Sequence, residues 1–228
     1  MNKALLNLLH LTDPTLPIGG FSHSAGLETY IQAGKVRDAA TAKEFVTEML
    51  SKNIHYTDAS FVSLGYDAAA DNDWKIIKEL DEECNAVKSA MEMRQSSRKM
   101  GVRLLKIFQP LCHDELVDQY ARAVKNQEIP GHYCLAFGLL ANRLNISKKE
   151  ALTGFYYNTA VGFVTNSVKL VPLSQQHGQE ILYSLHTMID DLAEKNLQPD
   201  IDLIGLCCSG FDIRSMQHEK LYSRLYMS

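Results

Sequence analysis

The stretch that decides the fold class is Thr41-Ala42-Lys43-Glu44-Phe45-Val46-Thr47-Glu48-Met49-Leu50-Ser51-Lys52-Asn53-Ile54. Its apolar side chains recur three and four positions apart, which is the spacing of one buried face of a helix. These side chains are Ala42, Phe45, Val46, Met49, Leu50 and Ile54. Thr41 followed by Glu44 matches a capping box, so we expect an amphipathic helix that begins at Thr41.

The same helical period recurs along most of the chain. A second capping box at residues 147–150 opens another segment, and Ser174 precedes a third segment that extends to Leu192. We expect a further helix from Trp74, after a turn at residues 71–73.

A long helix is expected from Met91 until Pro110 stops it. The chain contains no Asn-Gly or Asp-Gly hairpin turn and no sustained alternation of apolar and polar residues. The sequence therefore gives no indication of a β-strand. Residues 1–228 are therefore expected to form a single all-α domain, a bundle of about eight to eleven helices.

Composition bounds the class of protein. The chain has 228 residues, of which 46% are hydrophobic and 22% charged, and this is typical of a globular domain with a sizeable core. Its net charge of −4 gives no basic excess for binding nucleic acid. No apolar run is long enough for a membrane span, and residues 1–10 do not read as a signal peptide. The five cysteines form no CxxC pair and favour free thiols in a reducing cytoplasm: Cys84, Cys112, Cys134, Cys207 and Cys208.

Three common catalytic signatures are absent. The glycine pair in Ile18-Gly19-Gly20 lacks the lysine of a phosphate-binding loop, and Gly20 to Ser24 lacks the second glycine of a nucleophile turn. His218-Glu219 is followed by Tyr222 where a zinc-binding HExxH motif would have its second histidine. We therefore expect a binding protein rather than an enzyme.

Residues 13–28 form a tight path into a helix. Two prolines and two glycines fix this path, and Ser22 or Ser24 would cap the helix that follows. His23 would share a helix face with Leu27. Two interpretations stay open: a histidine buried in the core, or a polar surface for a partner or an ion.

Residues 212–228 interleave aromatic residues with arginines, the residue types enriched in binding hot spots. Two interpretations again stay open: the segment docks on its own core, or it becomes ordered on a partner.

One helix face in the middle of the chain places Arg94, Ser97 and Gly101 together. Gly101 permits a close helix approach, and Arg94 is either solvated or a buried or interface cation. Residues 172–179 are expected to join two helices.

Together these stretches resemble the urease accessory protein UreF family. The run from Leu16 to Glu28 and the ending from His218 to Ser228 are similar to the family's two specific end motifs. Residues 94–101, 131–138 and 171–179 follow in the family's order, so the resemblance spans nearly the whole chain. Ser174 and Tyr226 stand where the family often has glycine and phenylalanine.

The resemblance implies a cytoplasmic, homodimeric accessory scaffold that is not an enzyme, with no tightly bound cofactor and no nucleic-acid or membrane partner. It implies binding to a UreD/UreH-type accessory protein and recruitment of the GTPase UreG. The resulting complex would deliver nickel to apo-urease.

The same resemblance assigns Phe21 and Arg224 to the surface that recruits the GTPase, and residues 212–228 to a tail that the UreD-type partner orders. The residues expected to bind partners are Phe21, His23, Arg214, His218, Glu219, Tyr222, Arg224 and Tyr226. The residues expected to maintain the motifs are Pro17, Gly19, Gly20, Gly26, Arg94, Ser97 and Gly101.

No spacing encloses a metal site, and only His23 and His218 are weak candidates for the transit of nickel. One alternative is an all-α hydrolase that uses the Ser22-His23-Ser24 loop with Glu28, which would need a carboxylate–histidine pair in a deep pocket. The other is a helical interaction domain unrelated to urease.

Overall fold

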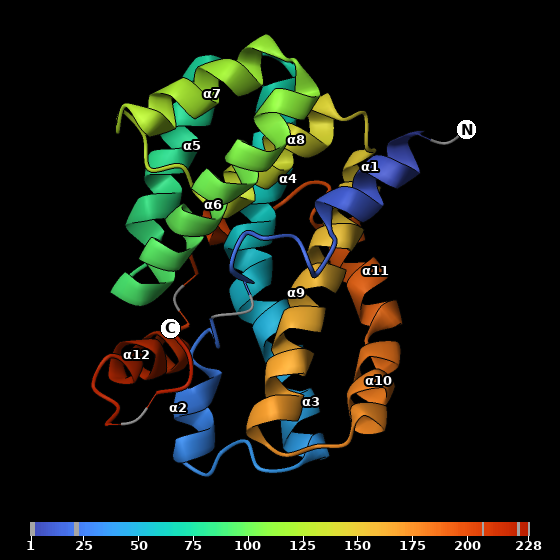
Figure 1. Ribbon diagram of the computed structural model, residues 1–228, viewed down its shortest axis with the longest axis vertical. Coiled ribbons are helices and arrows are strands. Elements are labelled where there is room, and N and C mark those ends of the chain that lie inside the picture. Colours follow the sequence, from blue (N-terminus) through green and yellow to red (C-terminus); the bar gives the residue numbers. More distant parts are fainter. Residues whose placement is uncertain (1–2, 21–22, 207, 223, 228) are drawn as a thin grey trace.

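The computed structural model describes residues 3–20, 23–206, 208–222 and 224–227. These residues contain twelve α-helices, one π-helical segment and one 3-10 turn, and no β-strand, which confirms the all-α class (Figure 1). None of the described helices combines the length and apolarity needed to cross a membrane.

The helices follow one another through short connections. The first six are α1 (Lys3–Leu11), α2 (Leu27–Gln32), α3 (Ala39–Glu48), α4 (Asp58–Ala70), α5 (Trp74–Val87) and α6 (Met91–Cys112). The other six are α7 (Glu115–Lys125), α8 (Tyr133–Arg143), α9 (Lys148–Leu170), α10 (Gln175–Ser184), α11 (His186–Lys195) and α12 (Ser209–His218). The π-helical segment η2 (Met49–Ile54) continues α3, and the 3-10 turn η3 (Ile201–Leu203) precedes α12.

The core lies between α4, α8 and α9, which the other helices surround (Figure 1). Phe61 of α4 and Phe137 of α8 are fully buried there. The Phe137 ring meets Phe155 of α9 edge-on, with the ring centroids 5.1 Å apart. Such aromatic pairs add about 0.5–1.5 kcal/mol to the area that they bury.

Local capping explains where several helices begin. Ser147 and Glu150 form the expected capping box at α9, and the Ser174 hydroxyl accepts from the His177 N–H at the start of α10. The expected start of α3 at Thr41 is wrong, because Asp38 is the cap. The Asp38 carboxylate accepts from the Thr41 N–H at 2.8 Å, which places the capping box nearly one turn earlier.

Two other helix boundaries differ from expectation. Pro110 does not stop α6 at once: the helix loses the one bond that the missing Pro110 N–H would donate, and it ends two residues later, at Cys112. The segment after Ser174 is two helices instead of one, since a tight turn at Leu185 separates α10 from α11. Because of this division, the described residues form twelve α-helices, whereas the periodicity predicted about eight to eleven.

Gly101 confirms the expected close approach. A Cβ atom on Gly101 of α6 would collide with the carbonyl oxygen of Gly131, just before α8. Ser97, one turn earlier, accepts the Tyr133 N–H at 3.3 Å and lies 3.1 Å from His132 Nδ1. Arg94 is half-buried and donates to the Lys88 carbonyl at 2.7 Å, so it serves the fold.

Candidate functional site

The segments that carry the two end motifs meet where α2 packs against α12, away from α1 and the N-terminus (Figure 1). Gly26 has a φ of 79°, and a Cβ atom there would lie 2.9 Å from the Ser215 hydroxyl oxygen of α12. Gly26, not a serine, is the N-cap residue of α2, but the Ser24 hydroxyl accepts from the Glu28 N–H in the first turn at 3.5 Å, so the predicted role of Ser24 is confirmed in part. His23 precedes α2 and therefore does not share a helix face with Leu27.

Glu28, in the first turn of α2, is buried and holds the end of the chain. Its carboxylate accepts hydrogen bonds from the backbone N–H of Leu225 at 2.9 Å and of Tyr226 at 3.3 Å. Its Oε2 also lies 3.3 Å from Nε2 of His218. Three contacts to C-terminal residues thus satisfy a carboxylate that would otherwise be costly to bury.

His218, the last residue of α12, lies fully buried between two carboxylates. Nδ1 is 2.7 Å from Glu92 of α6, while Nε2 faces Glu28. Glu92 also accepts from Arg224 at 2.8 Å. We call Glu28, Glu92, His218 and Arg224 the anchor cluster.

The last part of the tail, residues 219–222 and 224–227, is attached by its backbone and by Arg224, while three of its apolar side chains face solvent. Tyr222 is fully exposed, and Leu225 and Met227 are 80% and 58% exposed. Tyr226 is half-buried. Ile213 and Met216 of α12 add further exposed apolar area. The segment therefore contacts its own core, as the first interpretation expects, and the apolar side chains that it leaves exposed are of the kind that protein partners cover.

The remaining expected site residues are scattered around this cluster. Arg214 donates to the Gln217 side chain at 2.8 Å, and Glu219 is the C-cap residue that follows α12. Phe21 and Ser22 lie outside the described residues. Sequence reasoning missed Glu92, which carries no motif of its own and enters the site only through tertiary packing.

The expected motif positions before α2 lie in the loop that leads to the cluster. Gly19 is buried with a φ of 86°, Gly20 is half-buried, and Pro17 is exposed between the buried side chains of Leu16 and Ile18.

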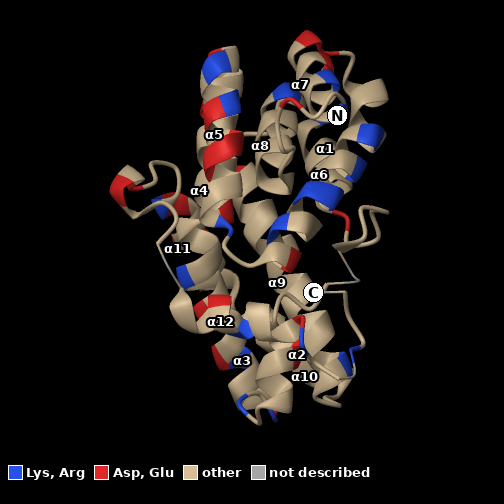
Figure 2. Cartoon of the chain, turned by 90° about the vertical axis from the view of Figure 1, so that its left-hand side faces the viewer, with Lys and Arg blue, Asp and Glu red and all other residues tan. Residues whose placement is uncertain are grey.

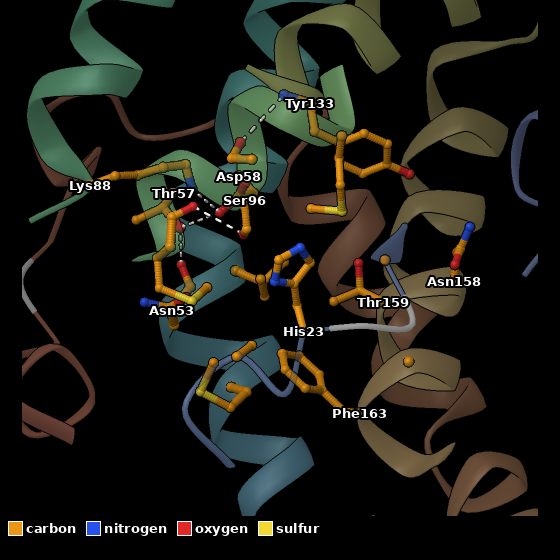
Figure 3. Close-up of a pocket in the computed structure, with 18 of the residues that line it drawn as sticks. His23, Asn53, Thr57, Asp58, Lys88, Ser96, Tyr133, Asn158, Thr159 and Phe163 are labelled. Atoms are coloured by element: carbon orange, nitrogen blue, oxygen red, sulfur yellow. Dashed lines mark hydrogen bonds and ion pairs between the residues drawn. The ribbon is translucent and has the colours of Figure 1, made fainter. Parts of the chain in front are cut away.

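A cavity of about 360 Å³ opens beside the same loop. In Figure 3, His23 lies amid the drawn side chains, with Asn53, Thr57 and Lys88 on one side and Thr159 on the other. Most of the wall is apolar and comes from the loop before α2, from η2, from α6 and from α9. Burial lowers the pKa of His23, and the positive charges of Lys99 and Arg103 lower it further. The neutral imidazole is therefore favoured.

Asp58 and Lys88 form an ion pair of 2.7 Å in the cavity wall. Burial alone would raise the pKa of Asp58, but the Lys88 ammonium holds it below its ordinary value. In the same way, burial alone would lower the pKa of Lys88, and the Asp58 charge leaves it raised. The pair ties the segment after α5 to the start of α4 and gives this wall little net charge.

The described residues contain no group of three or more His, Cys, Asp or Glu side chains that could hold a metal ion. Cys84, Cys112, Cys134 and Cys208 form no disulfide with one another, and Cys207 lies outside the described residues. The cavity wall, as far as the structure describes it, does not include Glu28, Glu92 or His218. The carboxylate–histidine contacts of the anchor cluster are therefore separate from the cavity that a hydrolase would use.

Comparison with known proteins gives a consistent result. The family model described as UreF matches residues 36–186. A urease accessory protein UreF of Actinobacillus pleuropneumoniae is 49% identical over 221 residues, covering 97% of each chain. The proteins of the same name from Haemophilus influenzae strain Rd and Bacillus sp. strain TB-90 are 44% and 31% identical. These two alignments cover 100% of this chain and 98% and 100% of the relatives.

Proposed function

This chain belongs to the UreF family of urease accessory proteins, and we propose that it acts in urease maturation as a scaffold with no catalytic chemistry of its own. Its partners in this proposal are a UreD/UreH-type accessory protein, the GTPase UreG and apo-urease, and the chain itself works as a homodimer in the cytoplasm.

The observation that supports the proposal is the outward-facing apolar side chains of the tail, with Tyr222 and Leu225 foremost. Covering them would contribute roughly 25 cal/mol per Å² of apolar area buried. Ordering a free segment costs about 1–2 kcal/mol per residue for the backbone. The bonds from Leu225 and Tyr226 to Glu28 reduce that cost. We propose that the UreD/UreH-type protein covers this surface and fixes residues 212–228.

Arg224 links the first partner to the second in this proposal. Its guanidinium contacts Glu92, yet its side chain is 41% exposed, so it retains a surface for a partner. The resemblance assigns Phe21 to the same GTPase-recruiting surface. Fixing the tail would hold Arg224 in place for UreG, so recruitment of the GTPase would depend on the first partner.

Nickel is the cargo of the complex in this proposal, and the isolated chain holds none tightly. His23 lies in the cavity wall, and His218 contacts two carboxylates. At most they are weak transit ligands. Equilibrium dialysis of the isolated chain should find no stoichiometric, tight nickel, and finding it would contradict this part of the proposal.

The test is co-expression of the chain with urease, the UreD/UreH-type protein and UreG. A chain ending at Gln217, and the double variant Tyr222→Ser, Leu225→Ser, should remain helical by circular dichroism but no longer capture UreG. In cells that express either variant, the activity and the nickel content of urease should also fall. Tyr183→Ser is the matched control, because Tyr183 of α10 is also exposed, at 76%, but lies outside the tail. Capture of UreG by the truncated chain would refute the tail mechanism.

A further inference from the structure

The α6 helix carries an excess of positive charge that the tail mechanism does not use. From Met93 to Cys112 it contains five Lys or Arg residues and no Asp or Glu, in a chain whose net charge is −4. Four of them are exposed and recur at helical spacing along one face: Arg98, Lys99, Arg103 and Lys106. Figure 2 shows the blue segments of α6.

These side chains line a groove of about 800 Å³ between α6 and α7. Lys125 of α7 adds a fifth positive charge, and Val102, Val124 and Pro130 contribute apolar surface. No carboxylate is among the described residues that line the groove. Asp118 of α7 accepts a hydrogen bond of 2.9 Å from Gln109, a lining residue, so it lies near the groove.

The five cations of the groove are not neutralised within the described part of the chain. None of them is in a salt bridge there. Arg98 donates to the Pro130 carbonyl at 3.3 Å, and Arg103 to the Ile18 carbonyl at 3.1 Å. Neutral carbonyls position these two guanidinium groups while leaving their charge uncompensated.

This arrangement costs stability. Lys99 and Arg103 are four residues apart on one helix, and a like-charge pair at this spacing is unfavourable. Their positive field reaches the loop before α2, where it adds to burial in lowering the pKa of His23. An acidic ligand in the groove would relieve the repulsion.

We propose that the groove between α6 and α7 binds an extended acidic segment of a partner protein. From Arg98 to Lys106 the helix rises about 12 Å, the length of roughly four residues of extended chain. Carboxylates spaced along such a segment match cations spread along a line. The apolar residues between the cations suit the aliphatic parts of its side chains.

Other anions match this groove less well. A phosphate ion or a nucleotide requires donors that converge on one point, whereas these cations are distributed along the helix. A nucleic-acid strand is bound through stacking on aromatic rings, and the described lining contains no aromatic side chain. The surface is distinct from the exposed tail, so the inference goes beyond the proposed scaffold function.

Fluorescence anisotropy with a labelled hexaglutamate peptide and the full chain tests the proposal. Hexaglutamate should bind better than a hexaglutamine peptide, and more weakly as sodium chloride rises from about 50 to about 300 mM. The double variant Lys99→Glu, Lys106→Glu should weaken binding by roughly tenfold or more, because each attraction becomes a repulsion.

The control is Lys35→Glu, Lys43→Glu, which changes net charge equally at exposed lysines outside the groove. It should retain binding to within about twofold. If the Lys99→Glu, Lys106→Glu protein does not fold, the variant Lys99→Gln, Lys106→Gln is used in its place. An equal loss in the control variant, or no preference over hexaglutamine, overturns the proposal. Displacement of the peptide by equimolar pyrophosphate or by a single-stranded oligonucleotide would show that the ligand class is wrong.

Discussion

The carboxylate of Glu28 accepts a hydrogen bond of 2.9 Å from the backbone N–H of Leu225, 197 residues further along the chain. With the neighbouring bond from Tyr226, it joins the start of α2 to the tail. A backbone donor gives this attachment without using the Leu225 side chain, which remains 80% exposed for a partner. The backbone of Leu225 thus attaches the tail to Glu28, while its side chain stays available to a partner protein.

Glu28→Gln should loosen the tail while the helical fold persists. The amide oxygen can still accept one backbone N–H, but the charge that binds two amides and faces His218 is lost. Amide hydrogen exchange at residues 224–226 should become at least several-fold faster. Glu44→Gln, at an exposed position of α3, is the control and should leave that exchange unchanged. Unaltered protection in Glu28→Gln would show that the carboxylate does not hold the tail.

Gly101→Ala should destabilise the protein strongly, because the added methyl group collides with the Gly131 backbone. Overpacking of this kind costs about 1–3 kcal/mol, and more where the obstacle is rigid. Gly162→Ala is the matched control: it is also helical, and nothing lies within 4 Å of its would-be Cβ. It should be neutral or stabilising by up to about 1 kcal/mol. Urea denaturation measures both, and similar midpoints for the two variants would contradict the close packing of α6 at Gly131.

The Asp58–Lys88 pair should show strong coupling in a double-mutant cycle. Either Asp58→Asn or Lys88→Met alone leaves one charge poorly solvated in the cavity wall, at a cost of about 3–5 kcal/mol. The double variant should lose much less unfolding free energy than the sum of the losses in the two single variants. Thermal or urea unfolding of the four proteins checks this, and additive losses would mean that the two charges are solvated independently.

Asp81 should give a distinctive pH dependence of stability. Burial raises its pKa to about 6, against the opposing effect of the hydrogen bonds that it accepts from His132 and Gly131. Because the folded state holds this proton more tightly than the unfolded state, the contribution is fully present below about pH 4 and is lost as pH rises towards about 6. The loss is on the order of 2–3 kcal/mol.

His132 acts in the opposite direction over part of this range, because burial lowers its pKa to about 3. Unfolding must therefore be compared between the wild type and Asp81→Asn at each pH, so that the His132 contribution cancels. The stability of the wild type relative to the variant should decline from about pH 4 to about pH 6. A difference that does not vary with pH would mean that Asp81 titrates normally.

Local signals in the sequence predicted much of the helical structure. The capping box that begins at Ser147, the helix start after Ser174 and the start of α5 at Trp74 are confirmed, because a helix start depends on side chains within one turn of it. The boundary errors have equally local causes. Asp38 and Thr41 form an alternative cap, and Pro110 falls in the last turn of its helix, where the chain tolerates it.

The candidate site was only partly predictable. The sequence indicated the importance of both end motifs, and His218 and Arg224 were identified as site residues. Their contacts to Glu92 and Glu28 could not be predicted, since these link α6, α2 and the tail across separations of 126 to 190 residues. No periodicity or spacing in the sequence encodes a contact of that range.

The sequence by itself determined that the chain is helical, that it lacks the common nucleotide, zinc and serine-nucleophile motifs, and that it resembles UreF, because each of these depends on residues close together in the chain. Tertiary packing alone decided that a buried carboxylate holds the tail and that the cations of α6 line a groove against α7. Burial, and the strength of a charge in a low-dielectric surrounding, depend on which distant segments exclude water from it.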